Sequence, residues 1–512
     1  MFEFIAAFKA IGLISPKGFF RLVSAIMRHG VNLMALLCYA AQTYGGQTAL
    51  VDEQETLDYN TLFSQSQTLS SILKARYHID KGQKVAFLCK NHASLVKALF
   101  AVSRLGANIY LLNVEMSPVQ FQLLLDHYHF DILVYDNELH SLVEQSGYAK
   151  EKIPAYHDTL PAVNTICTLA TDQKERLKRT SLGNLVILTG GTTGNFKTAV
   201  HKPSAMNYLN PCIAMLTRLK LSSCTTAYIA VPIYHGYGLA TLFLFILLGK
   251  KILIQRGFNA ENACKLIHGH HADATVVVPL MVYKMIRHNA EYLKSLTCIA
   301  SGGSELNPGS AAEILEKLGD ALYNLYGTSE AGLTTIATPQ DLRAASDTIG
   351  RKIPGVHLKI RDRQGKKVST GKIGGFYVKT RWSMMNKKSP WIFTGDMGYI
   401  DRNGRYFLCG RADDMIVSAG ENVFPAEVER ILSSHPQIAQ AAVIAVHDEN
   451  FGQRLKAFIL LRGDSVVSQE ELFDWLRTRT ARFQIPREIM FVESMPYTPL
   501  GKLDRKQLQR MG

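Results

Sequence analysis

A loop rich in glycine and threonine, bounded by an apolar stretch and a lysine, is the first group of residues with a recognisable chemistry. It occupies residues 185–197, LVILTGGTTGNFK. Glycines let backbone amides approach an anion, threonine hydroxyls donate hydrogen bonds and the lysine adds a positive charge, so the loop suits phosphate. A structural turn after a strand is the alternative. The candidate phosphate-binding residues are Thr189, Gly190, Gly191, Thr192, Thr193, Gly194 and Lys197.

The loop departs from the usual P-loop, which places a glycine directly before its lysine. Phe196 stands at that position. The pattern therefore indicates nucleotide phosphate without indicating a common nucleotide triphosphatase.

A second group combines an aromatic ring, hydroxyls and a carboxylate in residues 326–330, YGTSE. It follows the apolar run ALYNL, which predicts a strand, and ligands dock at strand ends in open α/β sheets. Glu330 suits Mg²⁺ beside a phosphate, and Tyr326 suits stacking on a base. The alternative is a capped turn into a helix. The spacing Gly327-x-Ser329-x-Ala331 lacks the last glycine of a hydrolase nucleophile elbow.

Three further clusters each have a plainer alternative. Asp396, in Thr-Gly-Asp, is suited to accept hydrogen bonds from ribose hydroxyls or simply to close a turn. Lys502 follows a loop shaped by Pro499 and Gly501, so it is a cation delivered into a site or a solvated lysine. The histidines and aspartate of residues 268–273 resemble a metal cluster, but helical spacing does not place them on one face, which favours a solvated helix end.

Short apolar runs that alternate with helix-period segments must position these groups. Helices are expected at residues 94–105 and 260–270. Buried strands are expected at residues 84–89, 107–113, 131–136, 185–190, 227–232, 251–255, 274–279 and 298–303. This alternation predicts an α/β fold in which parallel sheets are flanked by helices.

The pattern changes after about residue 350, where half-exposed strands joined by turns predict a β-rich subdomain. From about residue 413, helices near 425–434 and 468–478 alternate with three apolar strands. This tail is long enough to fold as a small α+β domain.

Composition bounds the class of protein and its partners. A chain of 512 residues with 47% hydrophobic content suits two or more globular domains. The net charge of +14 predicts anionic partners. We expect no nucleic-acid partner, because the chain has neither a basic–aromatic platform nor zinc-ligand spacing.

The expected compartment is the cytoplasm. Eight scattered cysteines without a CxxC pair indicate buried, reduced thiols, and the first residues lack the order of a signal peptide. Residues 1–43 mix apolar and basic residues, which suits either a membrane surface or a helix packed on the body. The apolar segment 228–249 contains Pro232, His235 and glycines, which favours a strand–turn–helix over a membrane span.

Seven motifs in order resemble the adenylate-forming (AMP-binding) enzyme superfamily, and the resemblance spans nearly the whole chain. They are ILTGGTTGNFK, VPIYHGYG, SGGSEL, YGTSEAG, IFTGDMGYIDRNGRYFLCGRADDMIV, SAGENVFPAEVE and TPLGKLDRK. LCKNHASLVKAL, LGANIYLLN, IATPQDLRAA and MIVSAGENVFPAEVE resemble bacterial medium- and long-chain fatty-acid–CoA ligases in particular.

The resemblance implies a reaction in two halves. A carboxylate attacks the α-phosphorus of ATP to give acyl-AMP and pyrophosphate, and the thiol of coenzyme A then attacks the acyl carbon. The resemblance assigns the 189–197 loop, Thr193 included, to the β- and γ-phosphates and Glu330 to Mg²⁺. It assigns Asp396 and Arg411 to the ribose and Lys502 to the attacking carboxylate and the α-phosphate. The remaining nucleotide-binding set is Gly303, Ser304, Asn324, Tyr326, Gly327, Thr328 and Ser329.

For the second half, the family turns its C-terminal domain about one residue, which by position is Asp413. The implied division is an adenylation domain at 1–410, a hinge at 411–413 and a mobile domain at 414–512. The turn would bring the coenzyme A path to the adenylate, lined by Ser418, Gly420, Glu421 and Asn422. His235 would gate an acyl pocket supplied by the apolar run that follows it, by the strand at 274–279 and by Leu280–Ile286. A packed, structural histidine is the alternative.

These motifs predict a fatty acyl-CoA ligase that uses ATP, Mg²⁺ and coenzyme A. We expect a monomer or homodimer in the cytoplasm, with the inner face of the membrane as a peripheral location. One alternative loads a carrier-protein phosphopantetheine, but about twenty residues between Glu330 and Thr348 leave no room for the insertion of dedicated acyl-AMP ligases. Another is a weakly active lipid-binding homologue, against which Lys197, Glu330, Asp396, Arg411 and Lys502 argue.

Overall fold

The computed structural model describes residues 2–169, 177–189, 197–201, 205–362, 364–383, 389–418, 421–448, 452–463, 465–498 and 502–511. The chain forms two compact units, and each is described by itself. The first contains Met1–Val277, Glu291–Cys298 and Arg381–Met385; the second contains Val278–Ala290, Ile299–Thr380 and Asn386–Gly512. Residues 414–512 belong to the second unit, so this division does not isolate them, and the hinge at 411–413 stays a prediction.

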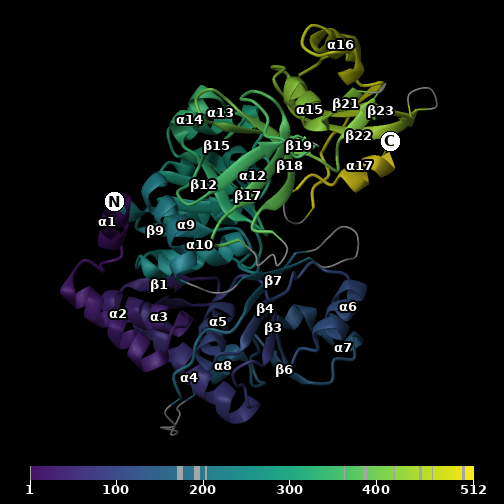
Figure 1. Cartoon of the computed structure of the whole chain (residues 1–512). Helices are drawn as coiled ribbons and strands as arrows, with labels where there is room; N and C mark the ends of the chain where they lie inside the picture. Colours follow the sequence, from purple (N-terminus) through teal and green to yellow (C-terminus); the bar gives the residue numbers. More distant parts are fainter. Residues whose placement is uncertain are drawn as a thin grey trace. The chain divides into compact units, whose positions relative to one another are not determined.

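The first unit contains a six-stranded sheet whose strands are parallel except for one hairpin (Figure 1). Its order is β6 (Glu151–Pro154), β5 (Ile132–Tyr135), β3 (Lys84–Leu88), β4 (Asn108–Leu111), β7 (Leu185–Thr189) and β8 (Lys197–His201). Helix α5 (Ala93–Leu105) is buried along its whole length. The connecting helices include α4 (Tyr59–Tyr77), α6 (Pro118–Tyr128), α7 (His140–Gln145) and α8 (Val163–Ile166). The βαβ alternation expected for this region is confirmed.

A second group of strands in the first unit is also parallel except for one antiparallel pair. Its order is β11 (Ala274–Val277), β9 (Thr226–Ile229), β10 (Lys251–Ile254), β1 (Thr48–Val51) and β2 (Thr56–Asp58). All residues of β9 and β11 are buried, as strands covered on both faces must be. Its helices are α1 (Phe2–Ala10), α2 (Pro16–His29), α3 (Leu33–Tyr44), α9 (Ala205–Arg218), α10 (Gly236–Leu247) and α11 (Ala260–Gly269).

The apolar segment 228–249 forms β9, a turn and α10, so the strand–turn–helix interpretation is confirmed. Among the residues that the structure describes, no helix combines the length and the apolar character needed to cross a membrane.

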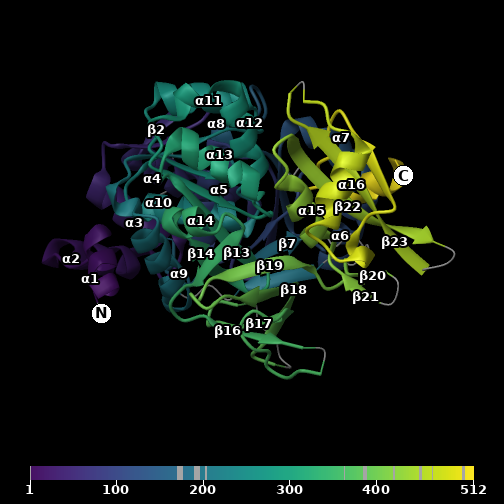
Figure 2. The same ribbon diagram turned by 90° about the horizontal axis from the view of Figure 1, so that it is seen from above.

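In the second unit a parallel pair of strands leads into an antiparallel, β-rich part. The order is β12 (Cys298–Gly302), β13 (Leu322–Thr328), β14 (Gly332–Ala337), β15 (Thr348–Lys352), β19 (Tyr406–Arg411), β18 (Ile392–Ile400), β17 (Gly374–Lys379) and β16 (His357–Arg361). Figure 2 shows β16–β19 in green as consecutive strands of this part. Helices α12 (Pro279–Asn289), α13 (Pro308–Leu318) and α14 (Pro339–Ala344) belong to the same unit. The expected change to half-exposed strands joined by turns is confirmed, and the structure shows that these strands pair in antiparallel register.

The C-terminal part of the second unit is a small α+β arrangement, as expected. Its sheet has the order β21 (Glu421–Val423), β20 (Ile416–Ser418), β23 (Gly452–Leu461) and β22 (Ile438–Asp448), with β24 (Glu488–Phe491) paired to β23. Residues that alternate along β22 and β23 face two cores. One core includes α15 (Pro425–Ser433) and α16 (Gln469–Arg477), and the other includes α17 (Arg505–Met511) (Figure 1).

Candidate active site

Tyr326 and Asp396 form the centre of the candidate site in the second unit. The phenol of Tyr326 donates a hydrogen bond to Oδ2 of Asp396, although 70 residues separate the two in the chain. Burial and the neighbouring carboxylate raise the pKa of Tyr326 well above its ordinary value, so the hydroxyl remains a donor. Burial raises the pKa of Asp396, while Tyr326 and Arg411 act in the opposite direction by stabilising its ionised form.

The strand register brings Arg411 to the same carboxylate. Asp396 on β18 lies directly opposite Arg411 on β19, and Nη1 of Arg411 is 3.4 Å from Oδ1 of Asp396. Asp396 therefore lies within a strand, which rules out the alternative that it merely closes a turn. Gly395 is needed at its position because its φ is +82° and an added Cβ would lie 2.6 Å from the Arg411 guanidinium.

The predicted nucleotide-binding residues of the SGGSEL motif follow β12, and those of the YGTSE motif lie at the end of the neighbouring strand β13. β12 and β13 are parallel, and Gly302 pairs with Leu325. Gly303 and Ser304 therefore follow β12 at the same edge of the sheet at which Tyr326 and Gly327 lie. Gly303 is exposed and Ser304 half-buried, so both are accessible to a ligand at this edge.

The YGTSE segment forms the tip of a hairpin, which corrects the alternative of a turn into a helix. β13 and β14 pair in antiparallel register, with Thr328 opposite Gly332. Ser329 is exposed and Glu330 half-buried in the turn, while Oγ1 of Thr328 accepts a hydrogen bond from the amide of Ala331. The half-buried Glu330 carboxylate at this tip is an oxygen ligand of the kind that Mg²⁺ accepts.

Asn324 is placed differently from the other predicted nucleotide-binding residues. It is buried in β13, and its Nδ2 donates to the carbonyl of Thr348 at 3.1 Å. Its amide thus holds β13 to the segment that begins β15, and its nucleotide-binding role stays a prediction.

The predicted phosphate loop joins two strands of the first unit that pair as a hairpin. Thr189 at the end of β7 pairs with Lys197 at the start of β8. Gly190, Gly191, Thr192, Thr193 and Gly194 lie outside the described residues, and only the backbone is described for Thr189 and Lys197. The expected strand before the loop is confirmed, and Lys197 begins a second strand that the sequence pattern did not predict.

His235 lies at the N-cap position of α10, and its ring packs against Tyr234 with 4.6 Å between ring centroids. The helix that it begins carries no charged side chain, and most of its residues are buried. The role of His235 as an acyl gate is not tested by these contacts.

Arg411 also contacts the predicted hinge. Its Nε donates to Oδ1 of Asp413 at 3.1 Å, and the amide of Asp414 donates to the Arg411 carbonyl. A single guanidinium therefore joins the candidate ribose carboxylate, Asp396, to the residue about which rotation is predicted.

Lys502 is exposed beside a loop closed by two hydrogen bonds with Thr498. The amide of Thr498 donates to the Lys502 carbonyl at 2.7 Å, and the amide of Lys502 donates to Oγ1 of Thr498 at 3.2 Å. These bonds fix the backbone from which the lysine extends.

For the predicted coenzyme A path, Ser418 pairs with Glu421 and Val417 with Asn422 in a hairpin, and Gly420 lies outside the described residues.

Two ion pairs that the sequence analysis missed involve α15. Nη1 of Arg430 lies 2.7 Å from Oδ2 of Asp347, and Oε1 of Glu429 lies 2.9 Å from Nη2 of Arg505. Consecutive residues of one helix thus bind a loop before β15 and helix α17. The partners of each ion pair are far apart in the chain, 83 residues for the first pair, so no local sequence pattern predicts these contacts.

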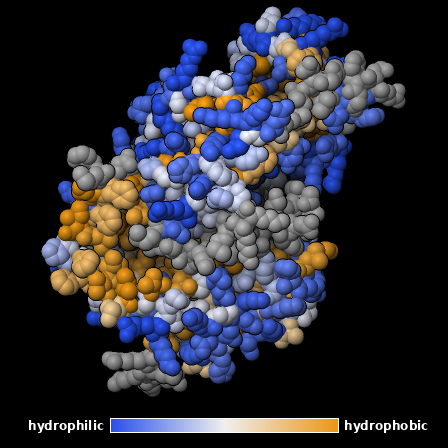
Figure 3. Space-filling model, viewed as in Figure 1, coloured by the Kyte–Doolittle hydropathy of each residue, from blue (hydrophilic) through white to orange (hydrophobic). Residues whose placement is uncertain are grey.

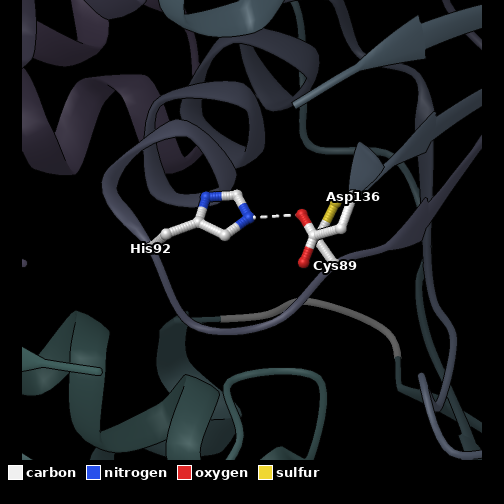
Figure 4. A group of neighbouring side chains, drawn as sticks. All are labelled: Cys89, His92 and Asp136. Carbon is white, nitrogen blue, oxygen red and sulfur yellow. Dashed lines mark hydrogen bonds and ion pairs between the residues drawn. The ribbon is translucent and has the colours of Figure 1, made fainter. Parts of the chain in front are cut away.

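Cys89, His92 and Asp136 form a buried cluster in the first unit that the sequence pattern did not predict (Figure 4). Nδ1 of His92 accepts a hydrogen bond from the backbone amide of Leu95 at the start of α5. The other ring nitrogen, Nε2, therefore carries the proton and donates a hydrogen bond to Oδ1 of Asp136 at 2.7 Å. That nitrogen is therefore not available as a metal ligand.

The remaining groups of this cluster also fit a structural role. Burial raises the pKa of Asp136, but hydrogen bonds from His92 and the Lys90 amide, with the Arg256 charge, lower it overall. Burial raises the pKa of the Cys89 thiol well above its ordinary value, and its Sγ donates to the carbonyl of Val134 at 3.5 Å. We interpret the cluster as a helix cap anchored to β5.

The histidines and the aspartate of residues 268–273 make separate contacts in the structure. His268 stacks on Tyr292, and His271 has a left-handed backbone. Asp273 accepts hydrogen bonds from the amides of Thr225 and Thr226 at the start of β9.

Two family models match this chain over most of its length. The AMP-binding enzyme model matches residues 38–386, and the model of the AMP-binding enzyme C-terminal domain matches residues 427–502. Tyr326 lies in the first range, Lys502 ends the second, and Asp396 and Arg411 lie between the two.

Individual ligases are similar to this chain over nearly its whole length. A fatty acid–[acyl-carrier-protein] ligase, ScoC, from Streptomyces coeruleorubidus is 27% identical, over 93% of this chain and 96% of the relative. A 2-succinylbenzoate–CoA ligase from Bacillus subtilis is also 27% identical, over 92% of this chain and 97% of the relative.

A solved structure of the o-succinylbenzoate CoA synthetase MenE from Bacillus subtilis, in complex with its acyl-adenylate intermediate, has a TM-score of 0.78 at 25% identity. The match covers 93% of this chain and 97% of that one. From the extent of the family match and the agreement in fold, the chain belongs to the AMP-binding enzyme family.

Proposed function

We propose that this protein is an ATP-dependent ligase that activates a medium- to long-chain fatty acid as acyl-AMP and transfers the acyl group to coenzyme A. In the first step a carboxylate oxygen of the acid bonds to the α-phosphorus of ATP and pyrophosphate leaves. In the second step the sulfur of coenzyme A bonds to the acyl carbon and AMP leaves.

The observation that carries the proposal is the Asp396 carboxylate held between Tyr326 and Arg411 in a member of an AMP-binding family. An ionised carboxylate accepts two hydrogen bonds from a ribose diol. Burial raises the pKa of Asp396, and the hydrogen bond from Tyr326 and the charge of Arg411 oppose that rise. The ring of Tyr326 lies at the same sheet edge as Ser304, where an adenine would have to sit.

The remaining roles are assigned by position in the family motifs. Thr189, Thr192, Thr193 and Lys197 would bind the β- and γ-phosphates, and Glu330 would hold Mg²⁺, which supplies positive charge to the phosphates when bound. The exposed Lys502 would bring its ammonium to the attacking carboxylate and the α-phosphate, because two anions must be neutralised before they react.

The preference for a fatty acid rests on apolar segments. α10 carries no charged residue, and every residue of β11 is buried. Alkyl chains suit apolar linings, so these segments are proposed to supply the acyl pocket.

A carrier protein is the second candidate acceptor. The relative from Streptomyces coeruleorubidus is named as a ligase of fatty acids to the acyl-carrier protein, and the identity extends over 93% of this chain. A phosphopantetheine thiol terminates both acceptors, so the first half-reaction would be the same.

One assay separates these functions. Pyrophosphate release would be measured with fatty acids of eight to eighteen carbons and with 2-succinylbenzoate, and the products would be identified by mass spectrometry. Each reaction would be run with coenzyme A, with a phosphopantetheinylated carrier protein and with neither. We expect acyl-AMP without an acceptor and acyl-CoA when coenzyme A is added.

The outcome that contradicts the proposal is release of pyrophosphate with fatty acids but thioester only on the carrier protein. Activation of 2-succinylbenzoate alone would overturn the fatty-acid assignment. No activation of any acid would favour a homologue that binds lipid without turning over ATP.

A further inference from the structure

Helices α1 and α2 expose an unusual amount of apolar surface. Of seventeen large hydrophobic side chains exposed among the described residues, eight belong to the first 31 residues. Figure 3 shows the hydrophobic colour gathered on the left of this view, where Figure 1 places α1, α2 and α3. We call the part on or beside α2 the outer apolar face; it consists of Ile14, Phe19, Phe20, Val23, Met27 and Val31.

The outer apolar face is separate from the face by which α2 packs on the protein. Ala25 is fully buried with residues of α3, and Leu22 and Ile26 pack against the same cluster. Phe20, Val23 and Met27 follow the i, i+3, i+7 spacing of one helix face and point away from that cluster. A helix at the surface of a globular protein needs one apolar face, so the second one requires its own explanation.

A row of cations flanks the outer apolar face. Lys17, Arg21 and Arg28 lie roughly a quarter turn or more around α2 from its centre, at 100° per residue. Arg179 adds a further cation, with Nη1 3.8 Å from the sulfur of Met27. Glu3 is the single acidic residue among the first fifty, so this end of the chain carries a local excess of positive charge.

We propose that the outer apolar face binds the surface of a membrane that contains anionic phospholipids. The apolar side chains enter the boundary between headgroups and acyl chains, and the basic row contacts the lipid phosphates. α2 has 14 residues and is about 21 Å long, less than the roughly 30 Å of bilayer hydrocarbon, so it lies along the surface. This inference does not depend on the acid that the enzyme activates.

The charge distribution favours a membrane over a second copy of the chain. A symmetric dimer through this face would bring each basic row close to the same row of its partner, where like charges repel. An anionic bilayer supplies the opposite charge on every side of the apolar centre.

Vesicle co-sedimentation of the full chain tests the proposal. Vesicles of phosphatidylcholine with about a third phosphatidylglycerol would be compared with pure phosphatidylcholine. We expect binding to the anionic vesicles that weakens in high salt. The double substitution Phe20→Ser with Met27→Ser should reduce the bound fraction at least roughly tenfold, because it removes two inserted side chains. Lys17→Gln and Arg21→Gln should each weaken binding by about fivefold, as expected for roughly 1 kcal/mol per surface cation.

Val119→Ser is the matched control, since Val119 is 71% exposed on α6, outside this face. It should bind as the wild type does. Hydrogen exchange of the wild type gives an independent readout that needs no variant, with protection of residues 16–31 expected when anionic vesicles are added.

Several results would overturn the proposal: no binding to anionic vesicles, equal loss of binding in the Val119→Ser control, or unchanged exchange at residues 16–31. Dimerisation that is abolished by Phe20→Ser with Met27→Ser, without vesicle binding, would assign the face to a second copy instead. Loss of membrane binding with normal pyrophosphate release, or the reverse, separates this proposal from the proposed function.

Discussion

Tyr326 and Asp396 share a hydrogen bond that joins the tip of the β13–β14 hairpin to the middle of strand β18. The bond satisfies two largely buried polar groups that would each be costly to leave without a partner. It also presents one carboxylate, supported by Arg411 from the adjacent strand, toward the sheet edge where the nucleotide is proposed to bind.

Tyr326→Phe should move the acidic limb of the pH profile of kcat/KM for ATP to higher pH. The phenol stabilises the ionised form of Asp396, so its removal raises a pKa that burial has already raised. A shift of about one pH unit corresponds to one hydrogen bond to a charged group. Tyr406→Phe, in the same core, is the control and should leave the limb in place. An unmoved limb in Tyr326→Phe would show that the ionisation of Asp396 does not govern ATP binding.

Lys502→Ala should reduce pyrophosphate release by about 10²–10³-fold, the usual loss when a preorganised donor to a transition state is removed. Thioester formation from supplied acyl-AMP should change much less, because that step begins after the α-phosphate has reacted. Lys506→Ala removes another exposed lysine from the same part of the chain and should behave as the wild type. Equal losses in both half-reactions would contradict the assigned role.

Asp413→Pro should separate the two half-reactions if the C-terminal part turns about this residue. Proline fixes φ, so adenylation should persist while acyl transfer falls by roughly tenfold or more. Asp413→Ala is the control, since it removes the contact with Arg411 but leaves the backbone free to rotate. Rapid-quench measurement of acyl-AMP and thioester distinguishes the variants; similar transfer rates would exclude rotation at this position.

The free energy of unfolding should fall in mild acid because His29 is buried. Burial, followed by the charges of Arg104 and Arg28, lowers its pKa from 6.5 to about 4. The unfolded chain therefore binds a proton at a pH at which the folded chain does not, so stability is present above about pH 6.5 and is lost as the pH falls toward 4. The full loss is about 3 kcal/mol.

Chemical denaturation at pH 7.5 and pH 5 checks this expectation. His29→Gln should show a smaller loss of stability at pH 5 than the wild type, whereas substitution of the exposed His357 by Gln should not alter the loss. Identical pH dependence in the wild type and His29→Gln would mean that His29 is protonated in the folded protein.

Local patterns predicted most of the elements. Apolar runs such as residues 84–89 and 274–279 became buried parallel strands, because strands covered on both faces must be apolar along their whole length. The pattern was less informative where pairing is antiparallel and short. Strand β8 after the phosphate loop and strand β14 after YGTSE were both missed, since a hairpin partner is recognised by its pairing and not by its composition.

The sequence by itself determined which residues could act on a nucleotide, because Asp396, Arg411, Glu330 and Lys502 each stand in a motif readable at short range. Only the tertiary structure decided which of them meet. The register of β18 with β19 joins Asp396 to Arg411, and the packing of distant strands joins Asp396 to Tyr326. Likewise, the amphipathic spacing of α2 was present in the sequence, but which of its two apolar faces is buried depended on the position of α3. Contacts between residues far apart in the chain are fixed by how elements pack, and the order of residues along the chain does not encode that packing locally.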